Sequence, residues 1–157
     1  MNDYPVAIDP EDLPQHTGSG YPKPLAGRMG ERARCALGDA FGLHQFGVNL
    51  ARLGPGAQSA LRHAHALEDE FVYILEGTPT LVTDAGETVL RPGMCAGFRA
   101  GTGDAHALVN RSDAEVVYLE VGSRKQNEAV DYPDDGMIGR NIDGRWTYLH
   151  ADGTPFE

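Results

Sequence analysis

Residues 61–77 have the sequence LRHAHALEDEFVYILEG, and the fold predicted for the chain rests on this stretch. His63 and His65 are two residues apart, so on a β-strand both imidazoles project from the same face. Glu70 has the opposite parity and cannot join them on one continuous strand. Residues 66–69 are long enough to reverse the chain, and Glu70 would then open a neighbouring strand with its carboxylate facing the two imidazoles. Two histidines and a carboxylate on adjacent strands form a metal-ligand set of the facial-triad kind.

A His-x-His pair by itself is also typical of two solvated histidines on a strand edge. A second stretch, residues 93–110, favours the metal site. Its sequence is GMCAGFRAGTGDAHALVN, and it ends in His-x-x-x-Asn at His106 and Asn110. The first stretch, H-x-H-x4-E-x6-G, resembles the first motif of the cupin superfamily, and the second stretch resembles the second motif. The resemblance covers roughly residues 45–121, about half of the chain, and is to small single-domain bacterial cupins.

Three positions depart from the family pattern. Ala57 stands where the first motif usually has glycine, Arg99 stands where the second usually has proline, and four residues rather than two separate Gly101 from His106. Arg99 shares its strand face with Cys95, opposite Phe98, which should seek the core. Two alternatives follow for Arg99: a rim residue that binds an anionic substrate, or a solvated residue pointing outward.

The resemblance implies a double-stranded β-helix, the jelly roll of cupins, with a metal inside its open end. By motif position, the ligands of one divalent metal ion would be His63, His65, Glu70 and His106. Iron, manganese, zinc, nickel and copper all occur in the family, and imidazole and carboxylate ligands do not decide among them. Cupins also commonly form homodimers, so we expect a homodimer here.

The fold alone does not specify a reaction. The first hypothesis is a metal-dependent enzyme that acts on a small polar or anionic molecule, with dioxygenase-, isomerase- or lyase-like chemistry. The alternative is a non-catalytic small-molecule binding or sensor protein that uses the same cavity. The catalytic residues themselves are not identified by the sequence.

The strand pattern independently predicts an all-β fold, because short apolar or alternating runs recur between Gly, Pro and Asp turns. Val72 and Ile74 share the parity of Glu70 and should line the cavity, while Tyr73 faces away. Residues 1–30, with five prolines, predict an extended N-terminal arm, with a disordered tail as the alternative. Residues 31–157 are then a single cupin domain. Residues 32–43 are expected to form a strand that leads to a turn at Gly38-Asp39, with a short helix as the alternative, and further strands are expected at 45–53, 71–75, 80–83, 87–90, 95–98, 105–110, 114–121 and 145–150.

Composition excludes several classes of partner. The formal net charge of -10 opposes binding to nucleic acid and to anionic membranes. There is no apolar run of membrane-spanning length and no signal-peptide pattern at the N-terminus, so we expect a cytoplasmic protein with a small-molecule ligand. The two cysteines, Cys35 and Cys95, have no metal-binding spacing, and core filling is their expected use. The other three histidines, His16, His44 and His150, are expected at the surface.

Overall fold

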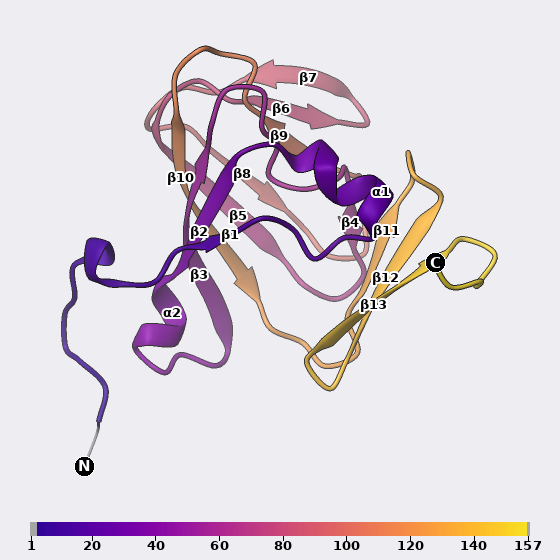
Figure 1. The fold of residues 1–157 in the computed structure, drawn as a ribbon, viewed down its shortest axis with the longest axis horizontal. Coiled ribbons are helices and arrows are strands. Elements are labelled where there is room, and N and C mark those ends of the chain that lie inside the picture. The colour runs from indigo at the N-terminus through magenta and orange to yellow at the C-terminus, as the bar shows by residue number, and fades with distance from the viewer. Residues whose placement is uncertain (1–2, 157) are drawn as a thin grey trace.

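The computed structural model describes residues 3–156, which form mainly antiparallel strands (Figure 1). The strands are β1 (His16–Thr17), β2 (Arg32–Ala36), β3 (Phe46–Leu53), β4 (Ala64–His65), β5 (Glu70–Glu76), β6 (Thr80–Thr83), β7 (Gly86–Val89), β8 (Cys95–Phe98), β9 (Ala107–Val109), β10 (Val116–Ser123), β11 (Ala129–Tyr132), β12 (Met137–Ile142) and β13 (Arg145–His150). The helical segments are short: η1 (Pro10–Asp12), α1 (Lys23–Ala26), η2 (Gly27–Met29) and α2 (Leu37–Ala40).

The strands form two layers. One is a six-stranded sheet in the order β1-β2-β3-β10-β5-β8. The other combines a sheet β13-β12-β11-β4 with a sheet β7-β6-β9, and isolated bridges, His63 to His106 and Gln58 to Val109, link the two. This arrangement confirms the predicted all-β fold of the jelly-roll type.

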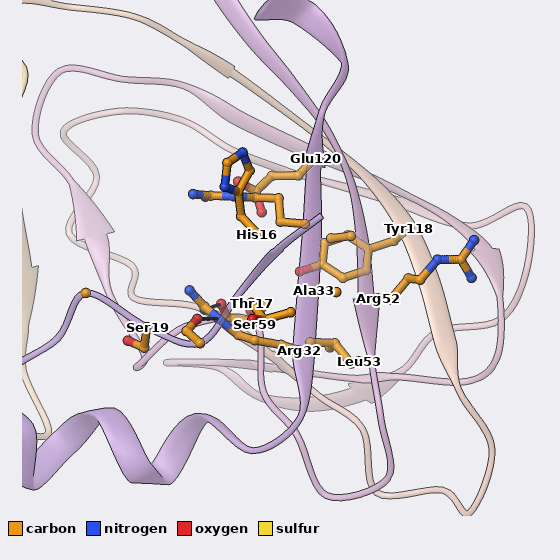
Figure 2. A pocket seen from close by; sticks show the side chains of 14 residues that line it. His16, Thr17, Ser19, Arg32, Ala33, Arg52, Leu53, Ser59, Tyr118 and Glu120 are labelled. Atoms are coloured by element: carbon orange, nitrogen blue, oxygen red, sulfur yellow. Dashed lines mark hydrogen bonds between the residues drawn. The ribbon is translucent and has the colours of Figure 1, made fainter. Parts of the chain in front are cut away.

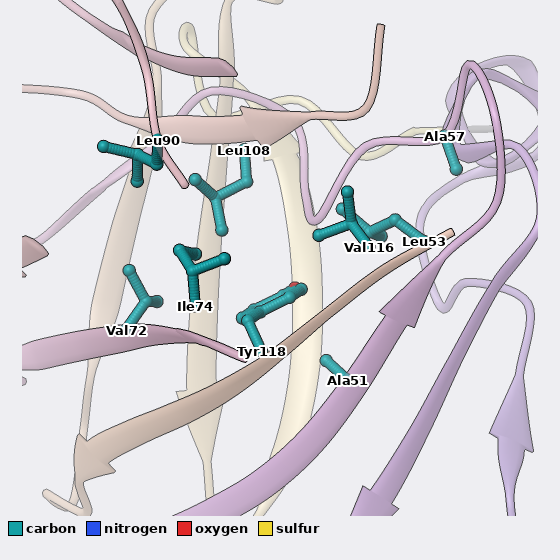
Figure 3. Packing of buried hydrophobic residues seen from close by; sticks show 9 residues of the cluster. All are labelled: Ala51, Leu53, Ala57, Val72, Ile74, Leu90, Leu108, Val116 and Tyr118. Carbon is teal, nitrogen blue, oxygen red and sulfur yellow. The ribbon is translucent and has the colours of Figure 1, made fainter. Parts of the chain in front are cut away.

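The core fills one end of the space between the layers (Figure 3). Val72 and Ile74, at 2% and 0% exposure, point inward from β5 as their parity predicts, and Leu108 meets them from β9. Gly77 ends β5 with a φ of +77°, and a Cβ there would lie 2.5 Å from the carbonyl oxygen of Glu115. Only glycine fits that turn, so the last residue of the first motif is fixed by backbone packing.

The six-stranded sheet carries exposed apolar side chains on the face away from the core. On β5 the side chains of Phe71, Tyr73 and Leu75, which we call the outer stripe, are 41%, 38% and 40% exposed on the face away from the core. Cys95 pairs with Tyr73 and is exposed on the same face, so the expectation that it fills the core is wrong, whereas Cys35 is buried as expected.

The N-terminal arm is partly extended and packs on the domain. Its strand β1 adds to the edge of β2, and the chain then crosses to the second layer (Figure 1). There Tyr21 and Leu25 pack against the cluster that contains Met29. Residues 1–2 of the predicted arm lie outside the described residues.

Two differences from the predicted elements concern loops. Residues 37–40 form the short helix α2, which was the alternative to the turn predicted at Gly38-Asp39. No strand was predicted in the polar stretch 123–137, but it contains β11, whose Val130 and Tyr132 are buried. Within residues 3–156, no helix is both long enough and apolar enough to cross a lipid bilayer.

Candidate metal centre

Three neighbouring segments bring the predicted ligands together. His63 and His65 flank Ala64 in and beside β4, and His63 forms a backbone bridge with His106. Glu70 opens β5, where it pairs with Phe98 on one side and Gly122 on the other. The chain reverses between His65 and Glu70, as the parity argument requires.

The side chains meet at Glu70. The donor atoms of His63, Glu70 and His106 lie close enough to share one ion, and His65 reaches this group through its contacts with Glu70 and His63. The Oε2 atom of Glu70 lies 3.0 Å from Nε2 of His106, 3.2 Å from Nε2 of His65 and 3.6 Å from Nε2 of His63. The Nε2 atoms of His63 and His65 are 3.2 Å apart. Metal–ligand bonds of about 2.1 Å place neighbouring donor atoms about 3.0 Å apart around an octahedral ion and about 3.4 Å apart around a tetrahedral one. The donor set therefore fits a divalent ion in size and in chemistry.

The surroundings of the imidazoles fix their orientation. The Nδ1–H of His63 donates to the carbonyl oxygen of Leu61 at 2.8 Å. The lone pair on Nε2 is then free to bind a metal. The ring of Phe98 stacks on that of His106, with centroids 3.5 Å apart and planes 2° from parallel. Phe98 thus takes the inward position that its parity predicts.

Burial and the mutual contacts of these groups shift their pKa values. Burial alone would raise the pKa of Glu70, but its contacts with the imidazoles of His106, His63 and His65 outweigh it and hold that pKa well below its usual range. Burial lowers the pKa of His106, which favours the neutral imidazole that a metal requires. For His65, burial opposes protonation, but the hydrogen bond and charge of Glu70 outweigh it and raise the pKa.

A second acidic residue, Glu128, lies against the turn that follows His65. Glu128 is 1% exposed, and its carboxylate accepts hydrogen bonds from the backbone N–H groups of Ala66, Leu67 and Ala129 at 2.9–3.2 Å. His65, Glu68 and Glu128 also lie close enough to share an ion. The oxygens of Glu128 are already engaged with backbone donors, so we assign it to the support of the turn after His65 and keep Glu70 as the candidate ligand.

His63, His65 and Glu70 line a cavity of about 1040 Å³. Its wall includes Glu120 on β10 and Arg34 on β2, both on the inner face of the six-stranded sheet. Burial and the charge of Glu70 raise the pKa of Glu120, and no hydrogen bond to its carboxylate occurs within residues 3–156. A carboxylate whose pKa is raised is a stronger base than a solvated one and is suited to accept a proton from a bound ligand.

Tyrosines from the N-terminal arm and from the C-terminal strands line the same cavity. The ring centroid of Tyr21 lies 5.5 Å from that of Tyr132 and 5.5 Å from that of Tyr148. Burial raises the pKa of Tyr132 and raises that of Tyr148 to about 12, so both hydroxyls remain protonated donors at neutral pH.

The structure brings together all four predicted ligand residues but not Arg99. Arg99 is exposed and does not belong to the lining of this cavity, so the rim alternative has no support. Sequence reasoning did not single out Glu120, Arg34 or Glu128. The signal for Glu120 was a lone carboxylate in the apolar run of β10 with the parity of the buried Tyr118. His16, predicted at the surface, is exposed but also lines the cavity.

Comparison with known proteins agrees with this architecture. The family model described as "Cupin domain" matches residues 49–122. The chain is similar to a sugar phosphate isomerase of a cupin superfamily from Silicibacter pomeroyi, with 43% identity, 96% of each chain covered and a TM-score of 0.93. It is also similar to a proposed sugar phosphate isomerase from Acidithiobacillus ferrooxidans, with 31% identity, 81% of each chain covered and a TM-score of 0.73.

A polyketide cyclase from Streptomyces resistomycificus shares the fold alone, at 19% identity, with 76% of this chain and 79% of that chain covered and a TM-score of 0.61. No curated protein sequence matches the chain.

Proposed function

This chain belongs to the cupin superfamily, and from that premise we propose that it is a metal-dependent isomerase of a small phosphorylated sugar. The observation that carries the proposal is one cavity lined by three of the candidate ligands (His63, His65 and Glu70), by Glu120 and by Arg34; the fourth candidate ligand, His106, contacts Glu70. The similarity to the Silicibacter pomeroyi protein supplies the substrate class.

The residues His63, His65, Glu70 and His106 would hold one divalent ion, with iron, manganese, zinc, nickel and copper all compatible with this donor set. When bound, the ion supplies a Lewis acid that polarises the sugar oxygens it touches. The Nδ1–H bond of His63 and the stacked ring of Phe98 hold two of the imidazoles in place for this purpose.

Interconversion of an aldose and a ketose moves one proton between adjacent carbons and one between their oxygens, with no net oxidation. A base must take the proton from the carbon beside the carbonyl and return it to the former carbonyl carbon. Glu120 suits this step because its carboxylate faces the cavity without a hydrogen-bond partner among the described residues. Burial raises its pKa, which makes it a stronger base than a solvated glutamate.

The phenols of Tyr132 and Tyr148 complete the site as donors to sugar hydroxyls. Both line the cavity, and their raised pKa values keep the O–H groups intact. Neutral donors of this kind orient a polyhydroxy substrate without adding charge beside the candidate metal.

The test is hydrogen exchange at carbon. The full chain, loaded in turn with each of the five metals, is incubated in D2O with a panel of phosphorylated aldoses and ketoses and followed by proton NMR. We expect deuterium to enter the carbon beside the carbonyl as the isomers interconvert. Glu120→Gln should slow this exchange by about a hundredfold or more with unchanged metal content. Binding of the panel without exchange, for every metal, would contradict isomerisation and favour the sensor alternative.

A further inference from the structure

A smaller cavity of about 200 Å³ adjoins the large one where β1 pairs with β2. Figure 2 shows His16, Arg32, Ser59 and Glu120 around it. Since a liquid water molecule occupies about 30 Å³, the space is large enough for a tetrahedral oxyanion with several waters. His16, Arg32, Arg34 and Glu120 line both cavities, so a ligand in one can extend into the other.

The carboxylates of the described residues do not neutralise all of the positive charge in this cavity. The arginines that form ion pairs within residues 3–156 do not include Arg34; they are Arg28, Arg52, Arg62, Arg111 and Arg124. Arg34 carries its guanidinium on the inner face of β2, opposite the imidazole of His16 in the β1–β2 register. Glu120 is the one carboxylate among the described lining residues, so Arg32 and Arg34 leave the cavity net positive.

Arg32 has a different function from Arg34. Its Nε donates to the carbonyl oxygen of Gly18 at 3.0 Å, and its Nη1 donates to that of Ser59. These bonds hold the arm against the sheet and fix the position of the guanidinium. A guanidinium carries five N–H donors, so Arg32 retains donors for a ligand while it holds the arm.

We propose that Arg34, Arg32 and His16 form the subsite for the phosphate group of the substrate. This inference rests on the proposed function, because it places the substrate's anionic end in the cavity that also contains the candidate metal centre. A phosphate accepts paired N–H bonds from a guanidinium, which is the recognition that unpaired arginines at a cavity provide. The N-terminal arm, through His16, is then part of the binding site.

The sheet order sets the length of the substrate. Between Arg34 on β2 and Glu70 on β5 lie β3 and β10, so the backbones of β2 and β5 are three steps, about 14 Å, apart across the sheet. The strand register places Arg34 level with Ile74, four residues from Glu70, which adds about 13 Å along the strands. The space between them suits a phosphate that is joined to metal-binding oxygens through several carbons.

Glu120 lies on β10, between the two ends. A sugar bound with its phosphate at Arg34 and its oxygens at the metal centre would pass this carboxylate with its middle carbons. The position of Glu120 is therefore consistent with a substrate held at both ends.

The test uses inorganic phosphate as the probe and isothermal titration calorimetry of the full chain as the measurement. The metal-loaded wild type and the His106→Ala variant, which should lose metal, are titrated in chloride buffer of constant ionic strength. Binding that persists in His106→Ala reports the subsite rather than the metal. We expect Arg34→Ala to weaken phosphate binding by about tenfold or more and to leave metal content unchanged. Arg34→Lys should recover part of the loss, because it keeps the charge but not the paired donors.

Two matched variants remove a positive charge elsewhere. Arg99→Ala removes an exposed arginine outside both cavities, and Lys125→Ala removes a cation that lines the large cavity after the end of β10. Both should bind phosphate as the wild type does. The proposal is overturned if the wild type shows no saturable binding, or if Lys125→Ala or Arg99→Ala loses as much affinity as Arg34→Ala.

Loss of folding must be distinguished from loss of phosphate binding. Arg34 is exposed and unpaired, so its variant should fold, and thermal denaturation checks this; if it does not fold, His16→Ala on the two-residue β1 must show the loss instead. Phosphate binding by a protein that exchanges no sugar hydrogen would refute the isomerase and keep the anion subsite. Exchange by a protein that does not bind phosphate at Arg34 would refute the subsite alone.

Discussion

Replacing Glu128 by alanine should both destabilise the protein and weaken metal binding. The carboxylate is 1% exposed and accepts N–H bonds from Ala66, Leu67 and Ala129. It therefore fastens β11 to the turn that joins His65 to Glu70. Without it, the N–H of Leu67 loses its carboxylate acceptor, whereas that of Ala66 keeps the carbonyl oxygen of Ala129 at 2.9 Å.

The magnitude follows from these bonds. A hydrogen bond to a charged group contributes about 1.5–3 kcal/mol, and an orphaned buried donor costs about 1–3 kcal/mol. The side chain of Leu67 is 49% exposed, so water reaches this turn and the lower part of each range applies. We expect Glu128→Ala to lower the free energy of unfolding by about 2–4 kcal/mol. Glu128→Gln keeps one acceptor oxygen and should cost about half as much.

Urea denaturation of the metal-free protein measures the loss, and metal titration measures the affinity. We expect metal affinity to fall by about 10–100-fold, since His65 directly precedes the released turn. Glu115→Gln is the matched control, because Glu115 is exposed in a pair with Arg52 and should change stability by less than about 1 kcal/mol. Equal stability of Glu128→Ala and this control, or an unchanged metal affinity, would refute the assignment of Glu128 as the support of this turn.

Three further outcomes are expected. The protein should bind one divalent metal per chain by elemental analysis, and Glu70→Ala should weaken that binding far more than Glu68→Ala; equal losses would mean that the wrong carboxylate is assigned. The pKa of Glu120 is raised in the fold by burial, so the folded state holds its proton more tightly than the unfolded state, and stability falls as pH rises from about 4.3 through the folded pKa. Glu120→Gln should therefore be more stable than the wild type at neutral pH in thermal melts and equal to it below about pH 4; a constant difference at all pH values would exclude this explanation. Finally, the outer stripe should be covered in a homodimer, so light scattering at micromolar concentration should give about twice 16.9 kDa, and a monomer mass would contradict it.

Parity and spacing in the sequence determined much of the site. The two-residue interval between His63 and His65 and the reversal before Glu70 follow from local geometry, whereas His106 was predicted from the resemblance to the second cupin motif; in the structure Glu70 contacts all three histidines. The inward position of Val72 and Ile74 came from the same alternation, because successive strand residues face opposite sides wherever the strand is placed. Fold class was accessible for a related reason: short strands between turn residues can be recognised without knowledge of their partners.

Strand order was accessible only from the tertiary structure, and the polar wall of the cavity depends on it. Arg34, Glu120 and Glu70 lie on β2, β10 and β5, which are far apart in the sequence and meet on one face because those strands share a sheet. The outer stripe shows the same limit: alternation predicts that Tyr73 faces away from the core, but not whether another segment covers that face. Glu128 supports His65 from 63 positions further along the chain, and only the pairing of β11 with β4 brings the two together. Such contacts are decided by long-range strand pairing, on which local sequence carries little information.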